Sequence, residues 1–308
     1  MSEAKNPLRI ELRQWRQFVV LAEELHFGRA AARLHMTQPP LTQAIAGLEQ
    51  TLGVRLFDRT RRSVALAPAA AALLPEVREL LVRAQGLPAL ARAAAAGEMG
   101  RLRLAFVSTV GFELLPRWVR AFRQRWPQIA LELIEATGDV QLEMLARGEA
   151  DAGMVLHSPG LQAPGLASAR IASEPLVVAL PESHPLAAHD HPGLAALLAE
   201  PLVIFPRRIL PTLHDAIFAL YHGSDRAPQV AQEAIQMQTI VNLVSAGLGL
   251  AWVPQSVRQF QRPGVVYRSV RPPRGRAMPA CETSLVWRAD AMSPTLAHFV
   301  DFALARAS

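Results

Sequence analysis

The sequence predicts an α/β protein with an N-terminal winged helix-turn-helix, a long linker helix and a C-terminal α/β domain of two subdomains. Residues 26–62 form a pattern of two helices around a short turn, followed by a basic hairpin. Residues 67–96 are rich in Ala and Leu, which are strong helix formers. Beyond Gly97 and Gly100, apolar strands alternate with amphipathic helices. This alternation is typical of layered α/β domains with parallel strand pairs.

The expected domain boundaries follow these changes of pattern. We expect the winged helix-turn-helix in residues 1–66, the linker and dimerisation helix in residues 67–97, and the α/β domain in residues 98–308. The last would consist of subdomain I, at about 98–168 plus 272–308, and subdomain II, at about 169–271, joined by crossing strands. A cleft between two such subdomains suits a small ligand near the carboxyl ends of strands.

The distribution of charge favours a nucleic acid as partner. The chain of 308 residues has a formal net charge of +6. Residues 1–66 contain ten Lys and Arg against six Asp and Glu, a net of +4, whereas residues 101–308 contain nineteen against seventeen, a net of +2. The excess is therefore concentrated beside the helix-turn-helix, as expected for a protein that binds phosphates.

The single cysteine, Cys281, excludes an internal disulfide framework and suits a reducing compartment. The N-terminus lacks the apolar run of a secretory signal, and no stretch approaches the roughly 20 apolar residues of a membrane span. We therefore expect a cytoplasmic protein with no membrane partner.

The opening helix is predicted by Leu12, Trp15, Phe18, Leu21 and Leu25, which recur at helical spacing. The first helix of the motif carries apolar residues at 30, 31 and 34. The side-chain oxygen of Thr37 is expected to cap the second helix, whose first turn tolerates prolines because its N–H groups lack helical partners. Gly53 is expected to end it.

The second helix of the motif has two contrasting faces at about 100° per residue. An apolar stripe faces the core and consists of Leu41, Ile45, Leu48 and Leu52. The opposite side is small or amide-bearing and carries Pro39, Pro40, Gln43, Ala46, Gly47 and Gln50, with Thr42 on the flank. Small residues allow close approach to a groove, and Gln and Thr can hydrogen-bond base edges. Three basic residues follow on the hairpin: Arg59, Arg61 and Arg62.

The linker helix has an apolar stripe that we expect to find no partner within so small a winged domain. The stripe consists of Leu73, Val77, Leu80, Leu81 and Leu87. An ordinary core helix is the alternative, but a long amphipathic helix between two domains more often pairs with its copy in another chain. Pro75 and Pro88 are expected to bend or interrupt it.

The α/β domain is expected to begin with a strand at 102–106. The predicted strands continue at 130–134, 152–156, 167–172, 175–180, 201–205, 229–233, 248–253, 264–269 and 282–288. The predicted helices lie at 114–126, 140–147, 212–221, 237–246 and 294–305.

The residues of the helix-turn-helix and of the α/β part together resemble those of a known family, the LysR-type transcriptional regulators. The matching pattern includes Phe27, Ala30, Ala31, Leu34, Thr37-Gln38-Pro39, Leu41-Thr42, Ile45, Leu48-Glu49, Leu52-Gly53, Leu56-Phe57 and Arg59. In the α/β part, it extends to Leu115-Pro116, Gly148, Asp151 and Gly247-Leu248-Gly249 with Pro254. The resemblance thus covers nearly the full chain.

The resemblance implies binding of double-stranded DNA by homodimers that assemble into homotetramers through the linker helices and effector domains. It implies an α/β domain of periplasmic-binding-protein (type 2) architecture that senses a small inducer, with no cofactor, and it adds RNA polymerase as a candidate partner. The implied DNA contacts come from Thr37, Gln38, Pro39, Pro40, Thr42 and Gln43, with Arg59, Arg61 and Arg62 on the wing. Two departures stand out: residues 66–70 lack the Thr-Pro-x-Gly that often follows the wing, and position 43 is often Arg.

The expected inducer site combines residues that follow strands. Ser108, Thr109 and Val110 follow the first strand, where hydroxyls and helix N-terminal N–H groups suit a carboxylate, although simple capping is the alternative. Thr137 follows the second strand, one position before the hydroxyl common in the family. The remaining expected contacts come after two later strands and are Phe205, Pro206, Arg207, Gln236 and Thr239.

Arg207 has two interpretations, one as a bidentate partner of an acidic inducer and one as a solvated surface residue. Capping is likewise the alternative for the segment that begins at Gln236. Several of these features resemble the branch that senses aromatic acids and their ring-cleavage products, while dicarboxylic acids are a second candidate class.

Other functions find little support in the sequence. His184, His189, Asp190 and His191 match no tetrahedral metal spacing. No G-x-S-x-G motif frames a serine, and Gly247-Leu248-Gly249 lacks the third glycine of a dinucleotide loop. A lone cysteine near an apolar strand is usually a small hydrophobe rather than a redox sensor. We therefore expect no enzyme, and the alternative is a solute-binding or transport-associated protein that uses the α/β domain alone.

Overall fold

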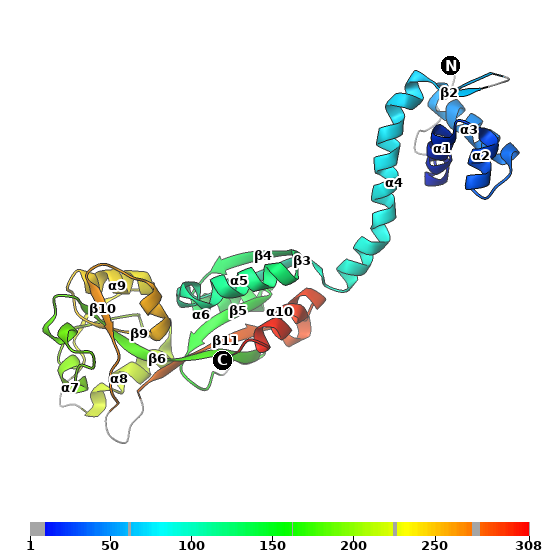
Figure 1. Cartoon of the computed structure of the whole chain (residues 1–308). Helices are drawn as coiled ribbons and strands as arrows, with labels where there is room; N and C mark the ends of the chain where they lie inside the picture. Colours follow the sequence, from blue (N-terminus) through cyan, green and yellow to red (C-terminus); the bar gives the residue numbers. More distant parts are fainter. Residues whose placement is uncertain (1–9, 61–62, 162, 224–226, 273–277, 308) are drawn as a thin grey trace, which may run out of the picture. The chain divides into compact units, whose positions relative to one another are not determined.

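The computed structural model describes residues 10–60, 63–161, 163–223, 227–272 and 278–307 (Figure 1). The chain divides into two compact units, residues 1–92 and residues 93–308. Each unit has its own hydrophobic core. Among the described helices, none combines the length and hydrophobicity that crossing a bilayer requires.

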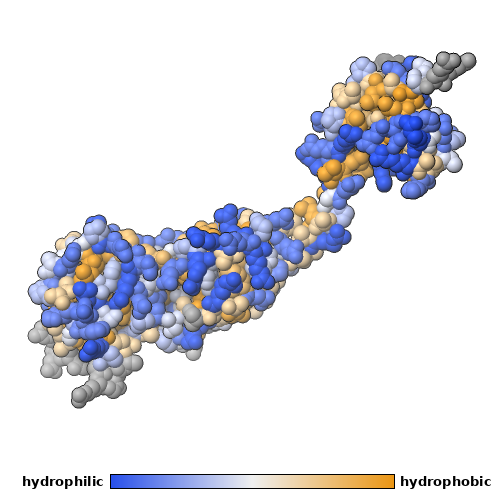
Figure 2. All heavy atoms as spheres, viewed as in Figure 1, coloured by the Kyte–Doolittle hydropathy of each residue, from blue (hydrophilic) through white to orange (hydrophobic). Residues whose placement is uncertain are grey.

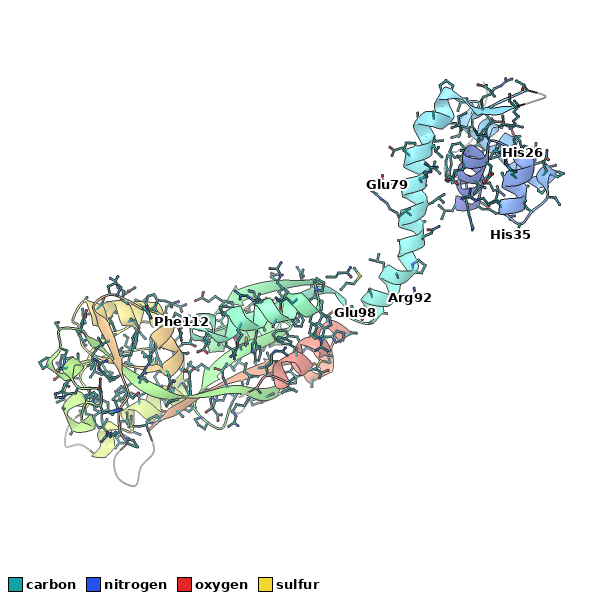
Figure 3. All side chains as sticks on the ribbon, in the orientation of Figure 1. His26, His35, Glu79, Arg92, Glu98 and Phe112 are labelled. Atoms are coloured by element: carbon teal, nitrogen blue, oxygen red, sulfur yellow. The ribbon has the colours of Figure 1, made fainter. Side chains whose placement is uncertain are left out.

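The first unit contains the predicted winged helix-turn-helix. Its elements are α1 (Leu12–Glu24), α2 (Phe27–Arg33), α3 (Gln38–Leu52) and the antiparallel hairpin of β1 (Phe57–Arg59) and β2 (Val64–Leu66). Thr37 precedes α3, but its side chain makes no capping hydrogen bond, so that expectation was wrong. Instead, His26 caps α2 because its Nδ1 accepts from the Arg29 N–H at 3.2 Å. Figure 3 shows His26 and His35 near the two ends of α2.

The linker helix, α4, runs without interruption over Pro68–Ala95, although Pro75 and Pro88 lie inside it. Of the two expected effects of the prolines, a bend or an interruption, the interruption is therefore not found. The expectation that its stripe lacks a partner in the winged unit also needs correction. Leu73, Val77 and Leu81 pack against that core, whereas Leu80 and Leu87 are exposed, along with Val82 and Leu90.

The second unit is built on a seven-stranded sheet, with the order β10-β6-β11-β5-β3-β4 and with β9 also paired to β6. The strands are β3 (Met99–Phe106), β4 (Gln128–Glu135), β5 (Ala152–His157), β6 (Ala167–Pro181), β9 (Ala251–Pro254), β10 (Val265–Arg268) and β11 (Ala280–Trp287). β3 lies parallel to both β4 and β5. The two strands expected at 167–172 and 175–180 are one strand, β6, which pairs with β5's neighbour β11 at one end and with β9 and β10 at the other.

Three helices pack on the half of the sheet that consists of β3, β4 and β5. They are α5 (Leu114–Arg125), α6 (Gly138–Ala146) and α10 (Pro294–Leu304), and the 3-10 turn η2 (Ser108–Phe112) precedes α5. Trp118 and Phe122 of α5 meet Phe299 and Phe302 of α10 at ring-centroid distances of 5.2–6.3 Å. These aromatic contacts fix α5, and therefore the turn before it, against α10.

The other half of the unit surrounds the far end of β6. It contains the parallel pair β7 (Leu202–Ile204) and β8 (Val230–Glu233), the helices α7 (Leu194–Leu197), α8 (Pro211–Phe218) and α9 (Met237–Ser245), and the 3-10 turn η5 (Gln255–Gln259). In the view of Figure 2 the surface of the α/β unit is mainly hydrophilic, as expected for a domain that buries its own core.

Candidate functional site

Helix α3 presents one side to the core and the other to solvent. Leu41, Ile45 and Leu48 are completely buried. Gln43 is exposed and has no hydrogen-bond partner among the described residues, while the Thr42 hydroxyl donates to the Gln38 carbonyl at 3.1 Å. Pro39 and Pro40, in the first turn of α3, are also exposed on this side. An exposed helix with free amide groups and small neighbours can enter a DNA major groove.

The hairpin is held to α3 by one carboxylate. Glu49 accepts hydrogen bonds from the N–H groups of Leu56 and Phe57 at 2.9 and 3.1 Å, and its second oxygen lies 2.9 Å from the Arg59 guanidinium. Arg59 also lies over the ring of Phe27, 4.9 Å from its centroid. Arg59 is therefore already paired within the protein, which makes it less available to a phosphate. Arg61 and Arg62 lie outside the described residues.

The structure separates paired arginines from unpaired ones, a distinction that charge counting missed. Arg29 and Arg33 form ion pairs with Glu24, and Arg33 with Glu23 as well. Arg55, directly before the hairpin, is exposed and has no ion pair among the described residues. A free guanidinium at this place is suited to a phosphate, and its position after the helix-ending Gly53 was the available signal.

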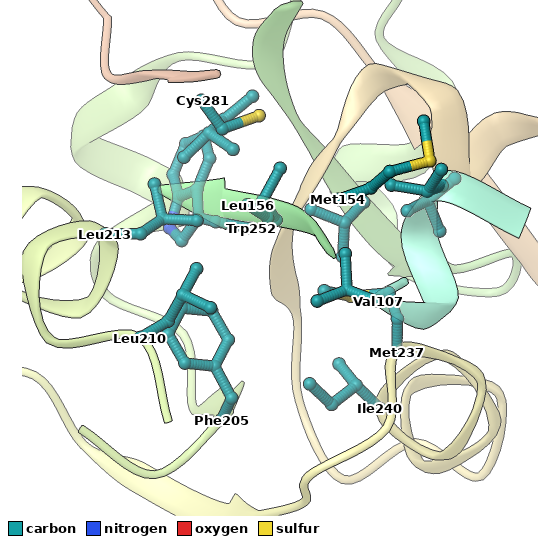
Figure 4. Close-up of a cluster of buried hydrophobic side chains, with 14 of the residues drawn as sticks. Val107, Met154, Leu156, Phe205, Leu210, Leu213, Met237, Ile240, Trp252 and Cys281 are labelled. Atoms are coloured by element: carbon teal, nitrogen blue, oxygen red, sulfur yellow. The ribbon is translucent and has the colours of Figure 1, made fainter. Parts of the chain in front are cut away.

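A second candidate site lies in the α/β unit, where segments from both halves meet. Its lining consists of Val107, Ser108, Thr109, Ala136, Thr137, Gly138, Leu156, Phe205, Ile209, Leu210, Ile235, Gln236 and Met237. We call this the cleft pocket. Figure 4 shows Val107 and Met237 on one side and Phe205 and Leu210 on the other. The structure thus brings together five of the expected inducer contacts, Ser108, Thr109, Thr137, Phe205 and Gln236.

The cleft pocket carries no ionisable side chain among its described lining residues, yet its electrostatics favour an anion. Helices α6 and α9 both begin at it, with Thr137 and Gln236 as their N-cap residues. Neither cap side chain bonds its own helix, which leaves the first N–H groups available. The Thr109 hydroxyl is buried and has no hydrogen-bond partner in the described part of the chain. N–H groups and positive helix ends converge here on an otherwise apolar space.

Four expected contacts do not line the cleft pocket. Val110 is buried and faces a different cavity, and Pro206 and Thr239 lie outside the lining. Arg207 forms two hydrogen bonds of 2.7 Å to the Asp215 carboxylate at the exposed surface. This pairing lowers the pKa of Asp215 and raises that of Arg207. The surface interpretation of Arg207 is therefore the one that fits its contacts.

The other singled-out residues have local structural roles. The Nδ1 of His184 accepts from the Leu186 N–H at 3.2 Å and caps a 3-10 turn. Within the described ranges, no group of three or more His, Cys, Asp and Glu is placed to hold a metal ion. Cys281 is buried, and burial raises the pKa of its thiol, which disfavours the reactive thiolate.

Comparison with known proteins decides the family. Residues 12–71 match the model described as bacterial regulatory helix-turn-helix protein, lysR family, and residues 95–308 match the LysR substrate binding domain. The chain belongs to the LysR family of transcriptional regulators. It is a DNA-binding regulator with an N-terminal helix-turn-helix and a C-terminal substrate-binding domain.

Relatives of the same architecture align over nearly the whole chain. The HTH-type transcriptional regulator IlvR of Caulobacter vibrioides is 44% identical, covering 93% of this chain and 95% of its own. AlsR of Bacillus subtilis is 37% identical, covering 94% of each. Among solved structures, full-length CbnR in complex with its target DNA has a TM-score of 0.79 at 30% identity, covering 97% of this chain and all of that one.

Proposed function

We propose that this LysR-family regulator reads its operator with α3 and is controlled by a small carboxylate bound in the cleft pocket. The observation that carries the inducer class is the convergence of two helix N-termini, α6 and α9, on a pocket without ionisable lining residues. An anion there gains hydrogen bonds from N–H groups without a counter-ion. The hydroxyls of Ser108 and Thr109 supply further donors.

The volume of the cleft pocket limits the size of the inducer. Its open volume is about 40 Å³, which is room for a few water molecules. A short carboxylic acid with an apolar body fits this space, with its apolar part against Phe205, Leu210 and Met237. An aromatic or longer dicarboxylic acid would require the two halves of the domain to move apart.

The proposed control works through assembly. The exposed apolar residues of α4 support a homodimer through the linker helix, and a homotetramer would use the α/β domains in addition. An acid that binds one closure state of the cleft more tightly shifts the population of that state. The spacing of the DNA-binding heads changes with it. Contact with RNA polymerase stays a prediction.

The solute-binding alternative is not favoured. A transport-associated protein would use the α/β domain alone, yet this chain carries a complete winged helix-turn-helix whose α3 exposes an unpartnered amide at Gln43.

The inducer proposal is tested by a thermal-unfolding screen of the full-length protein against short monocarboxylic, dicarboxylic and aromatic acids. At least one acid is expected to raise the unfolding midpoint and to change the affinity for operator DNA. Gln236→Ala, within the cleft pocket, should lower the affinity for that acid about tenfold, as expected for the loss of a hydrogen bond to a charged group.

Thr239→Ala is the matched control, because Thr239 lies on the same helix but is exposed and outside the lining. Its affinity for the acid should equal that of the unmodified protein. If no acid binds, or if both variants bind it as the unmodified protein does, the inducer proposal is wrong while the DNA-binding assignment is unaffected.

A further inference from the structure

A second cavity lies in the α/β unit beside the cleft pocket. Its volume is about 250 Å³. It is lined by η2, the start of α5, the crossing strands β6 and β11, and η5: Thr109, Val110, Glu113, Leu114, Arg117, Ala172, Ser173, Glu174, Gln255, Ser256, Arg258, Gln259 and Thr283. Only Thr109 belongs to the lining of both cavities. We call this space the hinge cavity because it spans the strands that join the two halves.

The hinge cavity has four charged side chains in its lining. Glu113 and Glu174 are acidic, and Arg117 and Arg258 are basic. None of the four forms an ion pair with any residue of the described part of the chain. The four formal charges of the lining therefore sum to zero, yet both signs of charge line the cavity without an ion-pair partner among the described residues. Glu174 and Arg258 are partly buried, and such groups are normally paired when they leave bulk water, whereas Glu113 and Arg117 are exposed.

Glu174 is the most firmly held of these groups. Its two oxygens accept hydrogen bonds from the N–H and the hydroxyl of Ser256, at 2.5 and 3.0 Å. Burial raises the pKa of Glu174, and the nearby charge of Glu113 raises it further. A cation between the two carboxylates would offset both effects. Because Ser256 fixes the orientation of the Glu174 carboxylate, that carboxylate is already positioned to bind such a cation.

Unpartnered polar atoms lie in the same lining. The Nε–H of Arg258 is buried without an acceptor, while its Nη2 donates to the Ser269 hydroxyl at 2.8 Å. The Thr109 hydroxyl has no hydrogen-bond partner among the described residues either, and Thr109 is only 5% exposed. A buried donor without an acceptor is costly, and an anionic oxygen beside Arg258 would satisfy it.

The lining is held in a defined shape by contacts around it. Phe112 of η2 packs against Phe260, directly after η5, with ring centroids 5.8 Å apart. Figure 3 shows Phe112 where the two halves of the α/β unit meet. The segments that carry Glu113 and Arg258 are thus joined by an apolar contact, so the acidic and basic groups are presented to the same space.

We propose that the hinge cavity binds a small zwitterion, of the α-amino acid class, at a second ligand site of this regulator. Its ammonium group lies between Glu113 and Glu174, and its carboxylate faces Arg258 and Arg117. A purely anionic ligand would meet two carboxylates, and a purely cationic one would meet two guanidinium groups. A ligand with one charge of each sign matches the lining on both counts.

The test uses the full-length protein and the twenty standard α-amino acids as probes. A thermal-unfolding screen should find at least one that raises the unfolding midpoint, and calorimetry should give one bound molecule per chain. The N-acetylated and the carboxamide forms of that amino acid each lack one charge. Each should bind about tenfold or more weakly, because each loses its charge-assisted contacts.

Two variants locate the site, and a third serves as the control. Glu174→Gln should weaken binding of the amino acid about tenfold or more. Glu113→Gln should also weaken it and, because Glu113 is exposed, tests the site even if Glu174→Gln fails to fold. Gln236→Ala, in the cleft pocket, should leave the affinity for the amino acid unchanged.

Three outcomes would overturn the proposal. They are the absence of any binding amino acid, binding that Glu113→Gln does not weaken, and binding that Gln236→Ala abolishes. The last would place the amino acid in the cleft pocket. The carboxylic-acid screen of the proposed function is read separately, so failure of one proposal does not imply failure of the other.

Discussion

At the residue scale, the winged unit uses its charges in two ways. Glu23, Glu24 and Glu49 hold arginines of the protein itself: Arg78 of α4 lies 2.8 Å from Glu23, and Arg59 lies 2.9 Å from Glu49. These pairs join elements of the unit to one another. Arginines without such partners remain for an external anion, and Arg55 is the one beside the hairpin.

Arg55→Ala should therefore weaken binding to all DNA duplexes by a similar factor. The slope of the logarithm of affinity against the logarithm of salt concentration should become shallower by about 0.9, the value for one phosphate contact. Arg29→Ala is the control, because Arg29 pairs with Glu24. Fluorescence anisotropy at several salt concentrations measures both, and equal slopes for Arg55→Ala and the unmodified protein would contradict the assignment.

At the element scale, periodicity in the sequence predicted most helices and strands correctly. It was sufficient for α1, α3 and the linker helix, because their apolar residues recur with one dominant period. It divided β6 between residues 172 and 175, whereas residues 167–181 form one strand in which Pro175 pairs with Ala280 of β11. It could not show that the Thr37 hydroxyl makes no cap, because that depends on the rotamer.

The candidate sites were predictable only in part. The resemblance to the family indicated Ser108, Thr109, Thr137, Phe205 and Gln236, which lie far apart in the chain and meet only in the fold. The ion pair of Arg207 could have been suspected from Asp215, an acidic residue within the next helix. The hinge cavity was not predicted, because its four charged residues come from separate segments and share no motif.

Gly97, just after α4, gives a prediction at the element scale. Its φ is +72°, and a Cβ there would lie 2.5 Å from the Pro294 carbonyl carbon at the start of α10. Gly97→Ala should therefore destabilise the protein by roughly 1–3 kcal/mol. Gly86→Ala is the control, since Gly86 lies within α4 with open space around it, and it should be neutral or stabilising by about 1 kcal/mol.

Urea unfolding of both glycine variants measures these changes. Equal stability of Gly97→Ala and the unmodified protein would mean that the junction between α4 and β3 tolerates a side chain. That result would contradict the close approach of Pro294.

At the scale of the whole molecule, the linker helix has apolar residues that its own chain does not cover. Leu80, Leu87 and Leu90 lie on one face of α4 and are between 43% and 58% exposed. Exposed apolar residues on a long helix are typical of a surface that pairs with another chain. We propose that this surface forms the homodimer that a two-headed DNA-binding protein requires.

Leu87→Glu should weaken self-association, because a pairing interface would have to bury the new carboxylate. Light scattering should report a lower mean mass at micromolar concentration, and affinity for a two-half-site operator should fall with it. Gln85→Glu, at another exposed position on the same helix, adds the same charge as a control. An unchanged mass for Leu87→Glu would place the dimer interface elsewhere.

The central claim is that α3 reads DNA sequence through its exposed face, and selection from a pool of randomised duplexes tests it most directly. The unmodified protein should enrich one sequence pattern. Gln43→Ala, which removes an amide worth about 1–3 kcal/mol of base discrimination if it contacts a base in the bidentate manner, should still bind and fold but should lose preference at particular positions of that pattern. Enrichment of the same pattern with the same strength by the variant, or of no pattern by the unmodified protein, would contradict the account.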